Sequence, residues 1–318
     1  MRGIFAALAL VCMAGPATAQ EYPSRPVHLV VPYTPGTGAD ILARVLGTKL
    51  TERWKSPVVV ENKPGATGNI GTDFVAKSTP DGHTLLLAAT SFATNPSLTR
   101  SLPFDPVKSF SPVGLVATSS LAVIVNPQVP AKSLNEFLDL ARREPGKLHY
   151  GSPGTGGVQH LAMELLKLET GIDVVHVPYK GLGGAMSDAI AGHVQAVISA
   201  LQSAAPHVQS GKLRMLAVMS AERAPSFPGV PTLKELGLQN LDVDTWYALF
   251  APAGTPPQAI MKINSDFNLM LEDATMKTLL EKQGMTAAGS SPEQMATMLR
   301  RELARWSRVV SAAGIKAE

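Results

Sequence analysis

Residues 25–44 read Arg25-Pro-Val-His-Leu-Val-Val-Pro-Tyr-Thr-Pro-Gly-Thr-Gly-Ala-Asp-Ile-Leu-Ala-Arg44, and this stretch decides how the rest of the chain is interpreted. The apolar run Val27–Val31 predicts a buried strand, and the Pro- and Gly-rich residues after it predict a turn. Apolar residues then recur at helical spacing and predict an amphipathic helix: Ile41, Leu42, Val45, Leu46, Leu50 and Trp54. A Gly-rich turn that opens a helix offers free backbone N–H groups and the positive end of the helix dipole, which suits an anion.

The tetrapeptide Pro-Gly-Thr-Gly of this stretch occurs twice. It stands at Pro35–Gly38 and again at Pro153–Gly156, each time between a short strand and an amphipathic helix. One such turn is a weak signal, because it also serves as a plain strand–helix connection, but a second copy favours a shared role. Two further Gly-rich turns, residues 62–71 and 178–184, also follow predicted strands.

Strands and helices alternate along most of the chain, which predicts an α/β fold with a parallel-rich sheet. In such sheets ligands bind beyond the carboxyl ends of the strands. The strand Leu121–Val125 predicts a crossing between two lobes, and the aromatic strand Trp246–Phe250 predicts a return to the first lobe. We therefore expect the second lobe to be inserted into the first, with residues 20–120 and 245–318 in lobe 1 and residues 121–244 in lobe 2.

Residues 1–19 have the pattern of a secretory signal peptide, with a basic start, an apolar centre and the small residues Ala17-Thr-Ala19 at the cleavage site. A lipid anchor at Cys12 is the competing interpretation, but Val11 is too large for the small residue that normally precedes such a cysteine. Without the signal the chain contains no cysteine, which excludes disulfides and a thiol nucleophile. No later apolar run reaches membrane-spanning length, so we expect a soluble protein exported to the periplasm.

Composition and motifs disfavour several classes of function. The net charge is +3 at pH 7, and the basic residues are scattered rather than clustered with aromatics, so nucleic-acid binding is not expected. The dinucleotide fingerprint fails, because its third glycine position is Ile41 in the first turn and Gln159 in the second. Neither a phosphate-binding loop nor the histidine spacing of a metal site occurs. We expect no cofactor and no metal.

An exported hydrolase is the enzymatic alternative. Ser152, His160 and Asp188 could come together as a triad, but triads are recognised by geometry, and most chains of this size contain such residues. The nucleophile-elbow pattern fails, because Tyr150 stands where its first glycine belongs. No catalytic residue is therefore predicted.

The Gly-rich turns could hold a carboxylate between them. The N–H groups of Thr37 and Gly38 in the first turn, and those of residues 155–157 in the second, would donate to it. Asp40 and Asp188 would repel such a ligand, so they are interpreted as helix-terminus residues. Side chains near the turns could add apolar walls or a positive charge: Tyr33, Phe92, Tyr179 and Lys180.

Several segments resemble the hallmark segments of one family. They are Val30-Val-Pro-Tyr-Thr-Pro-Gly-Thr-Gly-Ala-Asp40, Val60-Glu-Asn-Lys-Pro-Gly-Ala-Thr-Gly68, Tyr150-Gly-Ser-Pro-Gly-Thr-Gly-Gly157, His176-Val-Pro-Tyr-Lys-Gly181 and Trp246-Tyr-Ala-Leu-Phe-Ala-Pro-Ala-Gly-Thr-Pro256. The resemblance covers essentially the whole mature chain, and the motifs are specific when taken together. The chain is similar to the Bug proteins, the periplasmic substrate-binding receptors of tripartite tricarboxylate transporters.

The resemblance implies a two-lobed periplasmic binding protein of type II that closes on a carboxylate ligand. In that family the ligand is held mainly by main-chain and water-mediated bonds from the strand–helix turns of both lobes. The matching positions here are Tyr33, Gly36, Thr37, Gly38, Gly65, Ala66, Gly68, Ser91, Gly154, Thr155, Gly156, Gly157, Tyr179, Lys180 and Gly181. Thr37 departs from the usual Pro-Gly-Gly of the first turn.

We therefore expect a monomeric receptor without catalytic activity that passes a small organic carboxylate to membrane transporter subunits. The alternatives are a receptor that signals to a membrane sensor and, third, the exported hydrolase. Dicarboxylates, tricarboxylates, acidic amino acids and aromatic acids all remain open as ligands.

Overall fold

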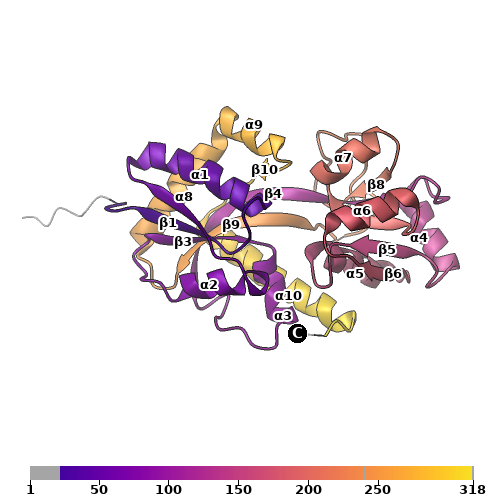
Figure 1. Ribbon diagram of the computed structural model, residues 1–318, viewed down its shortest axis with the longest axis horizontal. Coiled ribbons are helices and arrows are strands. Elements are labelled where there is room, and N and C mark those ends of the chain that lie inside the picture. Colours follow the sequence, from indigo (N-terminus) through magenta and orange to yellow (C-terminus); the bar gives the residue numbers. More distant parts are fainter. Residues whose placement is uncertain (1–21, 240, 317–318) are drawn as a thin grey trace, which may run out of the picture.

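The computed structural model describes residues 22–239 and 241–316, and it has two lobes joined by long strands (Figure 1). The predicted signal segment, residues 1–19 with Cys12, lies outside the described residues. No helix in the described part of the chain combines the length and the apolar character that a membrane span requires. The two-lobed α/β architecture confirms the predicted fold class.

The sheet of lobe 1 begins with three parallel strands and continues with antiparallel ones. β1 (Val27–Val31) lies between β2 (Val58–Asn62) and β3 (Thr84–Ala89), and both pairings are parallel. β9 (Asp244–Pro252) runs antiparallel between β3 and the first part of β4 (Phe110–Val125). The predicted aromatic strand is part of β9, and it does return to this lobe.

β4 links the two lobes. Its first part pairs with β9 and with the short β10 (Thr286–Ala287), whereas Leu121–Val125 pair with β7 (Ala196–Ala200). The sequence predicts only this second part as a strand, because Phe110-Ser-Pro112 has an irregular pattern. Pro112 and Gly114 lie at a shift in the register with β9, where a strand tolerates proline and glycine.

The sheet of lobe 2 contains a second parallel set. β5 (His149–Ser152) lies between β7 and β6 (Val175–Pro178), and both pairings are parallel. β8 (Arg214–Val218) pairs with β4 in antiparallel orientation. Each lobe therefore has parallel strands followed by helices, as the alternation in the sequence predicts.

Helices pack on the sheets of both lobes (Figure 1). Those of lobe 1 are α1 (Gly38–Trp54), the short 3-10 helix η1 (Ala66–Gly68), α2 (Asn69–Ala76), α3 (Ser91–Leu98), α8 (Pro257–Glu272) and α9 (Ala274–Lys282). Those of lobe 2 are α4 (Leu134–Arg143), α5 (Val158–Thr170), α6 (Leu182–Ala191) and α7 (Leu201–Gln209).

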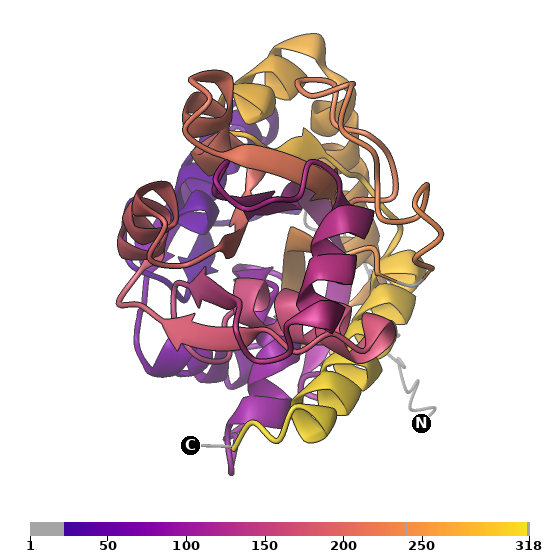
Figure 2. The same cartoon turned by 90° about the vertical axis from the view of Figure 1, so that its right-hand side faces the viewer.

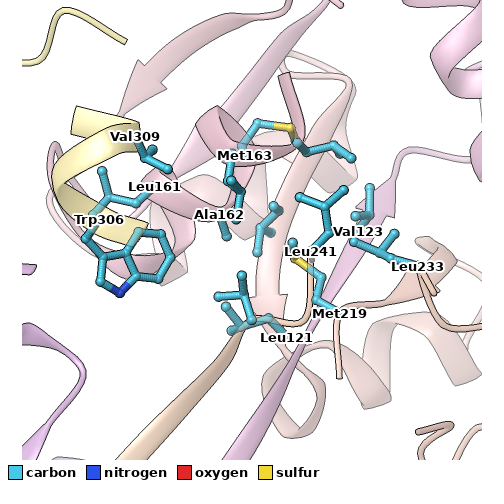
Figure 3. Packing of buried hydrophobic residues seen from close by; sticks show 14 of the residues in the cluster. Leu121, Val123, Leu161, Ala162, Met163, Met219, Leu233, Leu241, Trp306 and Val309 are labelled. Atoms are coloured by element: carbon cyan, nitrogen blue, oxygen red, sulfur yellow. The ribbon is translucent and has the colours of Figure 1, made fainter. Parts of the chain in front are cut away.

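The C-terminal helix α10 (Pro292–Ala312) packs against both lobes. It contacts α3 and β4 as well as α5, and Figure 2 shows it (yellow) running along the side of the molecule toward the C-terminus. Trp306 and Val309 of α10 lie beside Leu161 and Ala162 of α5 in one buried cluster (Figure 3). The hydrophobic core is therefore continuous across the connection between the lobes.

Candidate functional site

A cavity of about 540 Å³ lies between the lobes. Lobe 1 contributes the end of β3, the polar face of α3 and the turn at η1, and lobe 2 contributes the second Pro-Gly-Thr-Gly turn. The carboxyl ends of β3 and β5 thus meet at the cavity, where the fold class predicts a ligand. Among the described lining residues Lys316 is the single charged one, and none is acidic.

Side chains of lobe 2 hold the second turn from behind. Gly154 N–H donates to Ser152 Oγ at 3.2 Å, and Gly156 N–H donates to His160 Nδ1 at 2.9 Å. Gly156 has a φ of +77°, a conformation that favours glycine. The expectation that the Gly156 N–H is free for a ligand is therefore wrong, because that donor already has a partner.

Two other N–H groups of this turn remain free donors. Those of Thr155 and Gly157 have no hydrogen-bond partner among residues 22–239 and 241–316, and both residues line the cavity. Gly157 is the N-cap of α5, so the positive end of that helix dipole points to the same place. Thr155 is exposed at the tip of the turn. The turn can therefore present unpaired donors to an anion.

The facing turn in lobe 1 has an unusual backbone. Gly65, Ala66, Thr67 and Gly68 all have positive φ, at +131°, +46°, +54° and +97° respectively. For the two residues with side chains this conformation is strained, by about 1 kcal/mol each. Asn95 holds the turn by donating to the Thr67 carbonyl oxygen at 3.0 Å. Strain that the surroundings maintain beside a cavity is typical of a binding site.

Ser91 lies at the start of α3 and is supported by Tyr33. The Tyr33 hydroxyl accepts from the Ala89 N–H at 3.0 Å and lies 2.7 Å from Ser91 Oγ. Burial raises the pKa of Tyr33, so the phenol keeps its proton and can donate it to Ser91. The proton of Ser91 itself is then available to a ligand. Tyr33 acts from behind the cavity surface, since it does not line the cavity.

The first Pro-Gly-Thr-Gly turn is occupied by a carboxylate of the protein itself. Gly36 N–H donates to Asp40 Oδ2 at 2.9 Å, Arg44 Nε donates to the same oxygen at 3.1 Å, and Asn62 Nδ2 donates to Asp40 Oδ1 at 3.0 Å. Burial by itself would raise the pKa of Asp40, but these hydrogen bonds outweigh it and hold the pKa below its usual value. Asp40 therefore stays ionised and takes up the Gly36 N–H of this turn.

Thr37 and Gly38 have local roles in the first turn. The Thr37 hydroxyl caps α1 by accepting from the Asp40 N–H at 3.4 Å, and it donates to the Thr34 carbonyl oxygen at 2.9 Å. A Cβ atom on Gly38 would lie 2.6 Å from the Tyr247 hydroxyl, so glycine is required there by packing within the protein. The first turn does not line the cavity.

The predicted residues that follow β6 also lie outside the cavity. This holds for Tyr179, Lys180 and Gly181. The Tyr179 hydroxyl donates to Asp188 Oδ2 at 2.6 Å, which gives Asp188 a partner within the protein. Phe92 is a core residue that packs against other phenylalanine rings, so its expected role as a cavity wall is wrong.

The residues considered for a hydrolase do not form a triad. Ser152 is fully buried, and its Oγ lies 2.7 Å from His176 Nε2 rather than beside a nitrogen of His160. Asp188 is paired with Tyr179 and lies 3.3 Å from His193. Within the part of the chain that the structure describes, no group of three or more His, Cys, Asp or Glu is placed to hold a metal ion.

Sequence reasoning missed Asn95, Thr245 and Lys316, which also line the cavity, and it placed Thr67, Asn69 and Thr94 only within segments expected at this edge of the sheet. The spacing of Ser91, Thr94 and Asn95 places them on one face of a helix, and this pattern could have been noticed. Lys316 carries no such signal, since its position depends on where α10 ends in space.

Comparison with known proteins assigns the chain to a family. The family model described as the tripartite tricarboxylate transporter family receptor matches residues 42–315. The chain belongs to this family. Protein BugT of Bordetella pertussis is 37% identical over 316 residues, which cover 99% of this chain and 96% of BugT. The resemblance to the Bug proteins is therefore confirmed.

Solved structures of the family support the same assignment. Rpa4515 of R. palustris with adipate is 32% identical, with a TM-score of 0.77 over 94% of this chain and 100% of that one. MatC of Rhodopseudomonas palustris with bound malate is 30% identical, with a TM-score of 0.73 over 91% and 100%. The periplasmic binding protein BugD is also 30% identical, with a TM-score of 0.74 over 93% and 100%. The family is thus one of periplasmic solute-binding receptors, and the predicted class of function is confirmed.

Proposed function

We propose that this chain captures a small organic carboxylate between its lobes and delivers it to the membrane subunits of a tripartite tricarboxylate-type transporter. The observation that carries the proposal is the charge of the cavity between the lobes. Its described lining contains free N–H groups at Thr155 and Gly157, hydroxyl and amide groups from α3, the positive charge of Lys316 and no acidic side chain. Such a lining favours an anion with hydrogen-bond acceptors.

We propose two tiers of contact among the predicted site residues. Ala66, Ser91 and the turn Gly154–Gly157 line the cavity and would touch the ligand directly, while Tyr33, Gly65 and Gly68 would shape the wall behind it. The remaining ones would approach the ligand through their backbone only when the lobes close further: Gly36, Thr37, Gly38, Tyr179, Lys180 and Gly181. Their place after β1 and β6, at carboxyl ends of parallel strands, supports this second tier.

Closure of the lobes would be the signal that the receptor is loaded. We propose residues 20–120 and 245–318 as one lobe and 121–244 as the other, with β4 and β9 as the connections. The lobes already approach at the cavity, since a Cβ atom on Gly156 would lie 2.8 Å from Leu98 Cδ1 of α3. A bound carboxylate would add bonds to both sides of this gap and favour the closed form.

The transporter is preferred to a membrane sensor as the partner, because the family is one of transporter receptors. Export as a monomer through a cleaved signal at residues 1–19 completes the proposal. Membrane-subunit genes beside the gene for this chain would agree with uptake, whereas a sensor-kinase gene in that place would favour signalling.

Thermal unfolding in the presence of small acids tests the proposed function. Malate, adipate, citrate, glutamate and benzoate would be compared with the corresponding neutral amides. A ligand at a hundred times its dissociation constant adds about 2.7 kcal/mol to the free energy of unfolding, which raises the melting temperature by several degrees. A panel in which no acid shifts the melting temperature more than its amide would contradict carboxylate binding.

A further inference from the structure

A polar cluster that the proposed ligand contacts do not use lies behind the second turn. It consists of Tyr150, Ser152, His160, Glu164 and His176. The first four are at most 9% exposed, and His176 is partly buried. Burying polar groups costs free energy unless they are paired, so we expect a buried polar cluster beside a binding cavity to have a role there.

Two histidine rings connect this cluster to both ends of the turn. The rings of His160 and His176 stack with centroids 3.8 Å apart and an interplanar angle of 12°. His160 Nδ1 accepts the Gly156 N–H at 2.9 Å, and His176 Nε2 lies 2.7 Å from Ser152 Oγ. Ser152 donates to the Gly154 carbonyl oxygen at 2.9 Å. The stacked pair thus holds the two glycines and leaves the residue between them exposed to the cavity.

We propose that His160 and His176 are positioning residues, which as neutral imidazoles hold the second turn in the conformation that presents its free N–H groups to the ligand. The inference rests on the proposed function for its consequence in binding. Because Nδ1 of His160 accepts a hydrogen bond, the neutral ring carries its proton on Nε2. That nitrogen lies 4.0 Å from the carboxylate of Glu164.

Burial keeps the rings neutral near pH 7, and it outweighs the carboxylate of Glu164, which favours the protonated form. Tyr150 comes from β5 and Glu164 and Lys167 from α5, and Glu164 Oε1 accepts from Tyr150 at 2.6 Å and from Lys167 at 2.9 Å. Burial lowers the pKa of His160. Burial and the neighbouring His160 lower the pKa of His176 to about 4. Two stacked rings also resist protonation together, because two positive charges would then lie side by side.

The first turn shows why a neutral acceptor matters here. Gly36 has nearly the same φ as Gly156, and its N–H is also bonded to the side chain four residues later, which is Asp40. A carboxylate in that place fills the helix N-terminus with negative charge. An imidazole at the same place accepts the same bond and adds no charge, so the N-terminus of α5 stays available to an anionic ligand.

Three variants separate positioning from general stability. His160→Leu removes the acceptor, whereas His160→Asn keeps an oxygen close to the place of Nδ1. His193→Asn is the control, because His193 is an exposed histidine of the same lobe. With malate and adipate as calorimetric probes, we expect about tenfold weaker binding for the leucine variant. The asparagine variant should recover binding to within about threefold, and the control should match the wild type.

The outcomes that overturn the inference are equally specific. A folded His160→Leu protein that binds as the wild type does would show that the turn needs no histidine. Equal losses in the leucine and asparagine variants would show that the hydrogen bond to Gly156 is not the cause.

Nuclear magnetic resonance tests the positioning role without any ligand. Two-bond ¹H–¹⁵N spectra at pH 7 should show His160 neutral, protonated on Nε2 and accepting at Nδ1. The opposite tautomer, or a protonated ring, would overturn the inference even if the protein bound a carboxylate. If the wild type binds no acid at all, the proposed function fails, and the tautomer still decides whether His160 holds the turn.

Discussion

In the first Pro-Gly-Thr-Gly turn the helix begins at Gly38, inside the tetrapeptide, whereas after the second it begins at Val158, two residues beyond the tetrapeptide. The glycine before the N-cap has a left-handed φ in both turns, +83° at Gly36 and +77° at Gly156. These two glycines occupy the same position relative to their helices, although Gly36 is the second residue of its tetrapeptide and Gly156 is the fourth. Identical tetrapeptides are therefore not structurally equivalent.

The acceptors that the two glycines meet make the functional difference. Asp40 brings a full negative charge to the first turn, and His160 brings a neutral ring to the second. In the first turn a charged side chain of the protein takes the place of an anion and the turn lies outside the cavity, while the second turn keeps donors for a ligand and lines the cavity. The residues that follow a Gly-rich turn, rather than the turn alone, therefore decide whether it can bind an anion.

The largest expected effect comes from a bulky side chain at the second turn. In Gly156→Leu the side chain would meet Leu98 across the cavity and force a strained φ, so binding of malate or adipate should weaken about a hundredfold or more. Gly36→Leu has similar backbone strain but nothing within 4 Å of the new Cβ atom. Its affinity should fall much less in the same calorimetric titration. Equal losses of affinity in the two variants would show that the two turns do not differ in their contribution to binding.

Removing the acceptor of the first turn should affect stability more than binding. Asp40→Ala leaves the Gly36 N–H without its partner and removes one of the two partners of Arg44, and we expect a loss of about 2 kcal/mol in the free energy of unfolding. The wild-type pKa of Asp40 is lowered by folding, so its contribution is present above about pH 4 and is lost as the pH falls through the folded value. Urea denaturation of the wild type and the variant between pH 2 and 7 would measure this contribution to the free energy of unfolding. A variant with unchanged stability and abolished binding would show that Asp40 serves the ligand instead.

Lys316 should contribute less than the turns, because an exposed charge is screened. Lys316→Gln is expected to weaken malate binding about threefold at low salt and less at high salt, whereas Lys316→Arg should keep the affinity. Lys147→Gln is a suitable control, since that lysine precedes β5 at the end away from the cavity. Isothermal titration calorimetry at two ionic strengths would measure the affinity of each variant for malate. If the affinity is the same whichever residue stands at position 316, Lys316 does not contribute to the site.

The smallest expected effect concerns Thr37. Its hydroxyl caps α1, so Thr37→Ala should cost about 1 kcal/mol and Thr37→Gly only a few tenths, measured by urea denaturation. Neither change should alter the affinity by more than about twofold, because the hydroxyl is already bonded within the turn. A large loss of affinity in the glycine variant would place the hydroxyl on the ligand.

The sequence predicted much of the fold and part of the candidate site. Apolar runs such as Val27–Val31 indicated their strands because burial on both faces of a parallel sheet requires them. The first part of β4 escaped notice, since Pro112 breaks the local pattern and long-range pairing with β9 restores the strand. Of the proposed contacts, Ser91 and the second turn do lie at the cavity, and the first turn does not.

The α/β class, the repeated Gly-rich turns and the family follow from the sequence alone, because they depend on local patterns and on short motifs. Only the tertiary structure decided which donors are free. The partner of each turn N–H comes from a side chain placed by helix register, and the histidine pair is brought together from α5 and β6. Lys316 reaches the cavity because α10 packs across both lobes. Such distances between remote segments are set by packing of the whole chain, and no stretch of sequence encodes them alone.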